Sequence, residues 1–163
     1  MEIIEHEYKT KQPHTKRTVT REVILHCSAT PEGKDYDVTF IDRTHKGKGW
    51  NCIGYNFVIY RDGTIHRGRP EDTIGAHTLG HNSLSVGVCY IGGCASDGKT
   101  AKDTRTDAQK NAMYELVEYL MGKYKLTIQD VHGHYESAKK ACPSFKMEVF
   151  RKEYDRWKKE KDK

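Results

Sequence analysis

The amino-acid sequence predicts a mixed α/β fold, in which a central, mostly mixed sheet of about five or six strands is flanked by about three helices. Short runs of β-branched and apolar residues, such as Val23-Ile24-Leu25, recur along the chain and end in polar turns, as buried strands do. Other segments repeat apolar residues every three or four positions, as on one face of a helix. Since strands and helices do not alternate strictly, we expect a mixed sheet.

The first expected strand lies within residues 21–30 and finishes in a polar turn. His26 and Cys27 would stand at its C-terminal end and point to opposite faces of the sheet. A short helix follows, capped by Asp35 or Asp37. Its inward positions recur at intervals of three and four residues, and they are Val38, Ile41 and His45.

The second expected strand covers residues 54–60, and the tight turn of residues 61–64 leads into a partner strand near 65–67. After a long loop through 75–82, residues 83–93 form another strand. One of its faces carries Val86, Val88 and Tyr90, and the other carries Gly87, Cys89 and Ile91.

The clearest helix begins at Thr106, which forms a capping box with Gln109. Its apolar stripe is expected to pack on the sheet. The stripe consists of Ala112, Met113, Leu116, Val117, Leu120, Met121 and Tyr124. Residues 126–134 are interpreted as a strand that runs into a loop, and residues 146–160 as a terminal helix.

The length of 163 residues suits one hydrophobic core. We therefore expect a single catalytic domain at residues 19–163, preceded by an N-terminal arm or edge segment at 1–18. No apolar run approaches the roughly 20 residues that span a bilayer. Since the N-terminus also lacks the pattern of a secretory signal, we expect a chain that is made and kept in the cytoplasm until release or export brings it to its target.

Composition narrows the classes of site and of partner. The five cysteines are an odd number without a CxxC pair, which is typical neither of a disulfide framework nor of a zinc finger. The net charge of +5 suits an anionic partner such as nucleic acid, a membrane surface or a bacterial cell wall. Much of this excess lies in residues 151–163, where a solvated helix end explains it.

Three residues at expected strand ends or in the loops that follow are suited to a catalytic metal. His26 ends the first strand, His134 follows a late strand, and Cys142 comes eight positions later. A catalytic zinc takes three such ligands and leaves a fourth position to water. Spacing alone is a weak signal, because the chain has nine histidines and a His and a Cys eight apart occur often by chance.

Four strings make the signal specific, namely VILHCSAT, GYNFVIYRDGTIHRGR, GAHTLGHNSLSVGVCYIGG and GHYESAKKACPSF. In this order and spacing, the chain closely resembles the type 2 N-acetylmuramoyl-L-alanine amidase family. That family includes the phage amidases historically called lysozymes and the animal peptidoglycan recognition proteins. The resemblance covers roughly residues 20 to 150.

The resemblance implies an enzyme that hydrolyses the amide between N-acetylmuramic acid and L-alanine in peptidoglycan. It assigns one Zn²⁺ to His26, His134 and Cys142, and it assigns catalysis to Tyr55 and Lys140. Zinc brings the pKa of a bound water toward about 7. The Lys140 ammonium suits the oxyanion, and the Tyr55 phenol can orient the water or pass a proton to the leaving nitrogen; the sequence does not assign these tasks individually.

The resemblance also marks residues for substrate binding. His77 matches a histidine common in the family's substrate loop, and Asn82 lies in the same loop. The pair Gly49 and Trp50 stands where recognition proteins that prefer the diaminopimelate-type stem have a Gly-Trp pair. This pair suggests the hypothesis of a stem peptide that carries meso-diaminopimelate.

Two other functions remain as alternatives. A non-catalytic peptidoglycan-binding module is one, but recognition proteins that lost catalysis generally lack the Cys ligand, and Cys142 is present. A basic protein that binds nucleic acid or a polymerase is the other, and no basic stripe interleaved with aromatic residues supports it. The expectation is a monomeric, endolysin-like amidase that acts on the cell wall.

Overall fold

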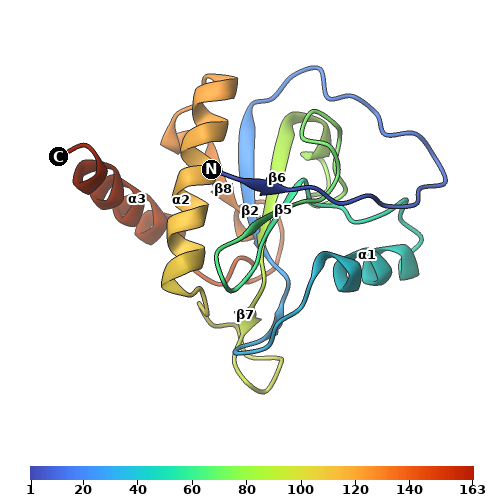
Figure 1. The fold of residues 1–163 in the computed structure, drawn as a ribbon, viewed down its shortest axis with the longest axis horizontal. Helices are drawn as coiled ribbons and strands as arrows, with labels where there is room; N and C mark the ends of the chain where they lie inside the picture. The colour runs from blue at the N-terminus through green and yellow to red at the C-terminus, as the bar shows by residue number, and fades with distance from the viewer.

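A six-stranded sheet with three α-helices around it makes up the protein, in a computed structural model that describes residues 1–163 (Figure 1). The strand order is β1-β5-β4-β6-β2-β8, and every neighbouring pair is parallel except β4 and β5. The strands are β1 (Ile3–Ile4), β2 (Glu22–Cys27), β4 (Phe57–Ile59), β5 (Ile65–Arg67), β6 (Ser85–Tyr90) and β8 (Val131–Gly133). The prediction of a mixed sheet of five or six strands is confirmed.

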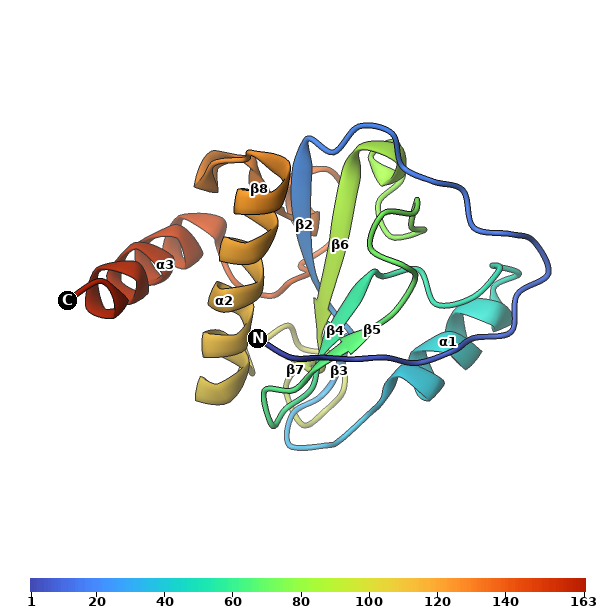
Figure 2. The ribbon, with the colours of Figure 1, turned by 45° about the horizontal axis from the view of Figure 1, so that its top comes forward.

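The helices cover both faces of this sheet (Figures 1 and 2). They are α1 (Val38–Gly47), α2 (Asp107–Tyr124) and α3 (Met147–Lys161). The larger core cluster joins α2 and α3 to residues such as Leu25 and Val88, and the smaller one joins α1 to residues such as Val58 and Cys89. Adjacent positions of β6 thus serve opposite cores, as the alternation along a strand requires. A separate two-stranded parallel sheet pairs β3 (Thr30–Pro31) with β7 (Gly93–Cys94).

Side-chain caps fix where the helices begin. The Asp37 carboxylate accepts a hydrogen bond from the amide of Phe40, so Asp37 and not Asp35 caps α1. Thr106 and Gln109 form the predicted capping box of α2. The fully buried Gln109 amide also donates to the carbonyl oxygens of Ile59 and Ile91, which fixes the start of α2 on the sheet.

Two expected strands are shorter than the sequence predicts. The strand expected at 54–60 is only β4, because the carbonyls of Tyr55 and Asn56 accept hydrogen bonds from Arg69 and Gly68 in the loop that follows β5. The first half of the strand expected at 126–134 is a 3₁₀ turn (Ile128–Asp130). The side chain of Asp130 accepts from the amide of Thr127 and stabilises this turn, which leaves β8 as a strand of three residues.

The N-terminal segment lies along the β5 edge of the sheet, where β1 pairs with β5 (Figure 2). His6 Nε2 lies 2.7 Å from His66 Nδ1, and the Tyr8 hydroxyl donates to the carbonyl of Arg67. Farther along, the Asn51 side chain bonds to the backbone of Gln12 in both directions. None of the three helices is long and apolar enough to cross a membrane.

Low pH should destabilise the protein through His66, which lies on β5 where the N-terminal segment pairs with the sheet. Burial, and then the neighbouring His6, lowers the pKa of His66 to about 4. The unfolded chain, where a histidine has a pKa near 6.5, therefore binds more protons than the folded chain between about pH 6.5 and 4. We expect the free energy of unfolding to fall as the pH drops through this window, and His66→Gln to remove on the order of 1 kcal/mol of that loss. Urea denaturation at several pH values measures the free energy of unfolding of the wild type and of His66→Gln. The same dependence of this free energy on pH in both proteins would contradict the prediction.

Candidate active site

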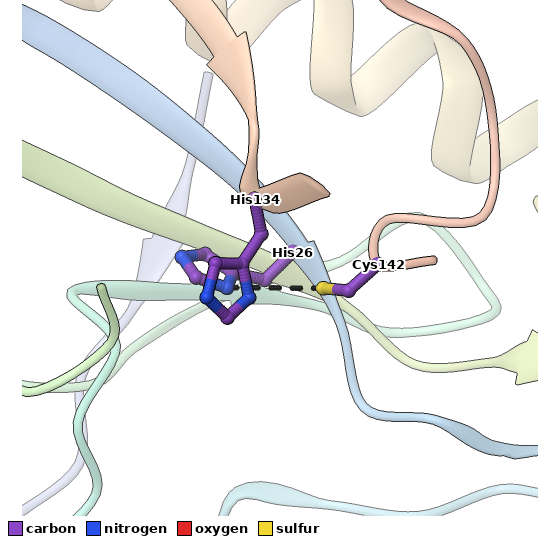
Figure 3. Close-up of side chains that lie close together, drawn as sticks. All are labelled: His26, His134 and Cys142. Carbon is purple, nitrogen blue, oxygen red and sulfur yellow. Dashed lines mark hydrogen bonds between the residues drawn. The ribbon is translucent and has the colours of Figure 1, made fainter. Parts of the chain in front are cut away.

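His26, His134 and Cys142 meet at one end of the sheet (Figure 3). His26 is near the end of β2, and His134 directly follows β8. Because β2 and β8 are paired and parallel, their C-terminal ends lie side by side, and the two imidazoles come together. Cys142 lies in the loop that returns toward α3, and the amide of Tyr135 bonds to the Cys142 carbonyl, which holds this loop beside β8.

The three side chains offer one ligand atom each within 4.8 Å of one another. Cys142 Sγ lies 3.8 Å from Nδ1 of His26, and the rings of His26 and His134 are 4.5 Å apart between centroids. The backbone amide of Cys27 donates to Cys142 Sγ over 3.1 Å. The neighbouring Cys27 thiol and burial raise the pKa of Cys142 overall, although this hydrogen bond lowers it, so the thiol keeps its proton until a metal binds.

Both imidazoles are held in the neutral form that metals require. Burial lowers the pKa of His26 well below 6.5, with further contributions from His77 and His134. Burial, followed by the Lys140 ammonium, lowers the pKa of His134. The ring nitrogens are therefore free to accept a metal at neutral pH without first losing a proton.

A chain of hydrogen bonds fixes the orientation of His26. Its Nε2 lies 2.9 Å from Nδ1 of His77, and Nε2 of His77 lies 3.3 Å from Oγ of Ser85. Burial, and then His134, lowers the pKa of His77 to about 3, so His77 is neutral. With a proton on Nε2, His26 donates to Nδ1 of His77, and Nε2 of His77 donates to Ser85 Oγ. Ser85 Oγ in turn donates to the carbonyl of His81. This direction leaves Nδ1 of His26 facing Cys142 as a free ligand.

A small cavity of about 190 Å³ opens beside the three side chains. His134, Cys142, Tyr55 and Lys140 line it on one side, and α1 forms the opposite wall. The Tyr55 ring lies 5.0 Å from that of His26, and burial raises the pKa of Tyr55 well above 10, so it keeps its proton. No acidic residue lines this cavity. Two exposed lysines line the cavity, Lys140 beside the two imidazoles and Lys48 at the end of α1.

Comparisons with known proteins agree with this arrangement. Residues 15–145 match the family model described as N-acetylmuramoyl-L-alanine amidase. The chain belongs to the N-acetylmuramoyl-L-alanine amidase family. An endolysin of Enterobacteria phage K11 is 40% identical over 138 residues, which are 85% of this chain and 89% of the relative.

Solved structures show the same fold. The N-acetylmuramoyl-L-alanine amidase LysC from Clostridium intestinale URNW superposes with a TM-score of 0.81 at 29% identity, covering 95% of this chain and 98% of that one. A complex of tracheal cytotoxin with the ectodomains of peptidoglycan recognition proteins LCa and LCx gives a TM-score of 0.73 at 26% identity, over 88% of this chain and 90% of the other. The predicted relation to the amidase and recognition-protein superfamily is confirmed.

The structure of this amidase places the four expected substrate-binding residues away from the lining of the cavity. His77 is only 7% exposed and lies behind His26. Asn82 accepts hydrogen bonds from the amides of His77 and Thr78, so it holds their loop together. Gly49 and Trp50 follow α1, where the Trp50 ring packs on His45 at 4.5 Å between centroids.

His45 is a residue of the cavity that the sequence analysis assigned only to the buried face of α1. Its Nδ1 accepts from the amide of Gly54, and burial, followed by Lys48, lowers its pKa to about 4. The hydrogen of the neutral ring is therefore on Nε2, as a donor beside Tyr55. A histidine at an otherwise apolar helical position was the signal that could have identified it.

Removing the acceptor on His77 should weaken metal binding in this amidase. His77→Phe keeps a ring but cannot accept from His26, and we expect the affinity for zinc to fall about 10- to 100-fold. His81→Phe is the matched control, since His81 lies in the same loop and pairs with Glu22 instead. Competition with a chromophoric chelator measures both affinities. Zinc binding by His77→Phe as tight as that of the control would contradict the orienting role.

Proposed function

We propose that this amidase is zinc-dependent and hydrolyses the bond between N-acetylmuramic acid and L-alanine in peptidoglycan. The observation that carries the proposal is the meeting of His26, His134 and Cys142 beside an open cavity. Two imidazoles and one thiolate are a donor set typical of catalytic zinc, and no fourth protein ligand of the kinds zinc takes is grouped with them. The residues present therefore fit zinc with one position left for solvent.

Zinc held there would lower the pKa of a bound water toward about 7 and so supply hydroxide at neutral pH. The protein's own groups account for the remaining requirements. Lys140 lines the same cavity and lies close enough to both imidazoles to lower their pKa values, so its ammonium can stabilise the oxyanion that develops on the lactyl carbonyl. No carboxylate in the cavity competes for that charge.

Tyr55 is suited to the proton transfer. Burial raises the pKa of Tyr55, so the resting phenol carries a proton and is not a base; a zinc ion held beside it would oppose that rise and make the phenol a better acid toward the departing alanine nitrogen. The neutral His45 offers a second donor, to a substrate carbonyl, from the α1 wall. We assign the oxyanion to Lys140 and the leaving-group proton to Tyr55.

The relatives support a role at the bacterial cell wall. Several are named endolysins, and one solved neighbour holds tracheal cytotoxin, described in a related complex as a monomeric diaminopimelic acid-type peptidoglycan. We propose peptidoglycan of the cell wall as the substrate, a monomer as the active form, and residues 19–163 as the catalytic unit. The meso-diaminopimelate hypothesis stays a prediction, and it fails if lysine-type stems are cut equally well.

Digestion of purified peptidoglycan tests the reaction. The proposal predicts new free L-alanine amino termini and no new reducing sugar ends, loss of activity with a chelator, and recovery with zinc. New reducing ends would instead indicate a glycosidase. Glycosidases generally use a pair of catalytic carboxylates, and no carboxylate lines this cavity. Binding of muropeptide without any turnover would indicate the recognition module.

A further inference from the structure

A second cavity, of about 540 Å³, shares the lining residue Lys140 with the cavity beside His134 and Cys142, which we call the metal cavity. Lys140 lines both, so a substrate whose reacting amide lies beside it can extend from one into the other. The second cavity lies between the 135–146 loop and Ala101. Its lining consists of Ala101, Tyr135, Ala138, Lys139, Lys140, Ala141, Ser144, Phe145 and Lys146.

The lining offers positive charge without a counter-charge. Lys139, Lys140 and Lys146 are exposed, and none of them is among the ion pairs of the chain, which lie elsewhere. Lys146 Nζ instead lies 4.9 Å from the centre of the Tyr135 ring. No aspartate or glutamate lines the cavity. Three ammonium groups that face one cavity without a carboxylate lower the free energy of an anion bound there.

The two hydroxyl groups of the lining are already hydrogen-bonded within the protein. The Tyr135 hydroxyl accepts from the amide of Met147, and Ser144 Oγ donates to the carbonyl of Gly93. The remaining lining side chains are apolar, apart from the lysines. A sugar hydroxyl requires both donors and acceptors, whereas a carboxylate accepts only. The positive charge of the three lysines, with no carboxylate in the lining, therefore favours a carboxylate over an uncharged sugar.

Peptidoglycan carries such a group close to the scissile bond. The muramic acid carboxyl is consumed in the amide, so the glycan next to it is uncharged. The glutamate that follows L-alanine is joined through its side-chain carboxyl and keeps a free α-carboxylate. We propose that Lys139 and Lys146 bind this α-carboxylate in the second cavity, an inference that rests on the proposed function and adds a specificity determinant to it.

Two soluble muramyl tripeptides that differ only at this group provide the test, one with the free α-carboxylate and one with its carboxamide. The wild type should have a KM about 10-fold lower for the carboxylate form. Lys139→Gln combined with Lys146→Gln keeps side-chain length and removes both charges. It should raise the KM for the carboxylate form about 10-fold, leave the KM for the carboxamide unchanged, and keep kcat within about twofold.

Lys152→Gln is the control for net charge, since Lys152 is exposed on α3 and lines neither cavity. Equal changes of KM for the two substrates, or an effect of Lys152→Gln as large as that of the double variant, would overturn the proposal. Dissociation constants from calorimetry on the same proteins separate the two claims. Failure to cleave either compound would reject the amidase reaction. The binding proposal for the second cavity would still be supported if the wild type binds the carboxylate form more tightly than the carboxamide and the double variant does not.

Discussion

Cys142→Ser should remove the metal and the activity together. The neutral serine hydroxyl is a much poorer ligand than a thiolate, and it also lacks the sulfur that accepts from the amide of Cys27. We expect the affinity for zinc to fall by at least about 100-fold. This loss is larger than that expected when a residue that only hydrogen-bonds a metal ligand, such as His77, is replaced. Amidase activity at limiting zinc should fall in proportion, and metal content after dialysis should drop below one ion per chain.

Cys94→Ser is the matched control for this change. Cys94 is buried on β7 and is not one of the three grouped ligands, so the same exchange of sulfur for oxygen there should leave zinc affinity unchanged. Thermal unfolding of both variants in the presence of a chelator shows whether they fold alike without metal. A Cys142→Ser protein that keeps wild-type metal content and activity would reject the proposed ligand set.

Lys140→Ala should separate chemistry from metal binding. The ammonium is assigned to charge that appears only in the transition state, so its loss should lower kcat by about 100- to 1000-fold. Zinc should stay bound, since Lys140 is not a ligand, and the affinity should rise slightly because this ammonium also lowers the pKa of His134 by repulsion. Steady-state kinetics on a soluble muropeptide, together with metal analysis, measures both effects.

The neighbouring Lys139 provides the comparison. Lys139→Ala removes the same charge one residue away. Because Lys139 lies outside the metal cavity and is assigned to binding the substrate carboxylate, its loss should raise KM and leave kcat at saturating substrate near the wild-type value. A similar kcat for the Lys139 and Lys140 variants would mean that Lys140 acts only through general electrostatics. Loss of zinc from Lys140→Ala would show that Lys140 supports metal binding and would contradict its assignment to the oxyanion alone.

Local patterns predicted those features that depend on short stretches of chain. The β-branched run before His26 identified β2, and the capping box at Thr106 identified the start of α2. The resemblance of four strings brought His26, His134 and Cys142 into one set, and the parallel pairing of β2 with β8 explains why residues so far apart in the chain meet.

The remaining features depend on contacts between distant segments. Tyr55 lies just before β4 and not within it, because Gly68 and Arg69 take the hydrogen bonds of its segment. His77 lies behind His26 and outside the lining of the cavity because its ring fits against β6 where Gly87 has no side chain; a Cβ there would come within 2.6 Å of the His77 ring. Neither the loop pattern nor the spacing contains that information.

The most direct test of the account is the zinc X-ray absorption spectrum of the purified protein loaded with one equivalent of zinc. Two imidazoles, a thiolate and a solvent molecule predict one sulfur at about 2.3 Å and three nitrogen or oxygen atoms at about 2.0–2.1 Å, with the sulfur lost in Cys142→Ser. A first shell without sulfur, or one that the Cys142→Ser exchange leaves unchanged, would contradict the proposed centre.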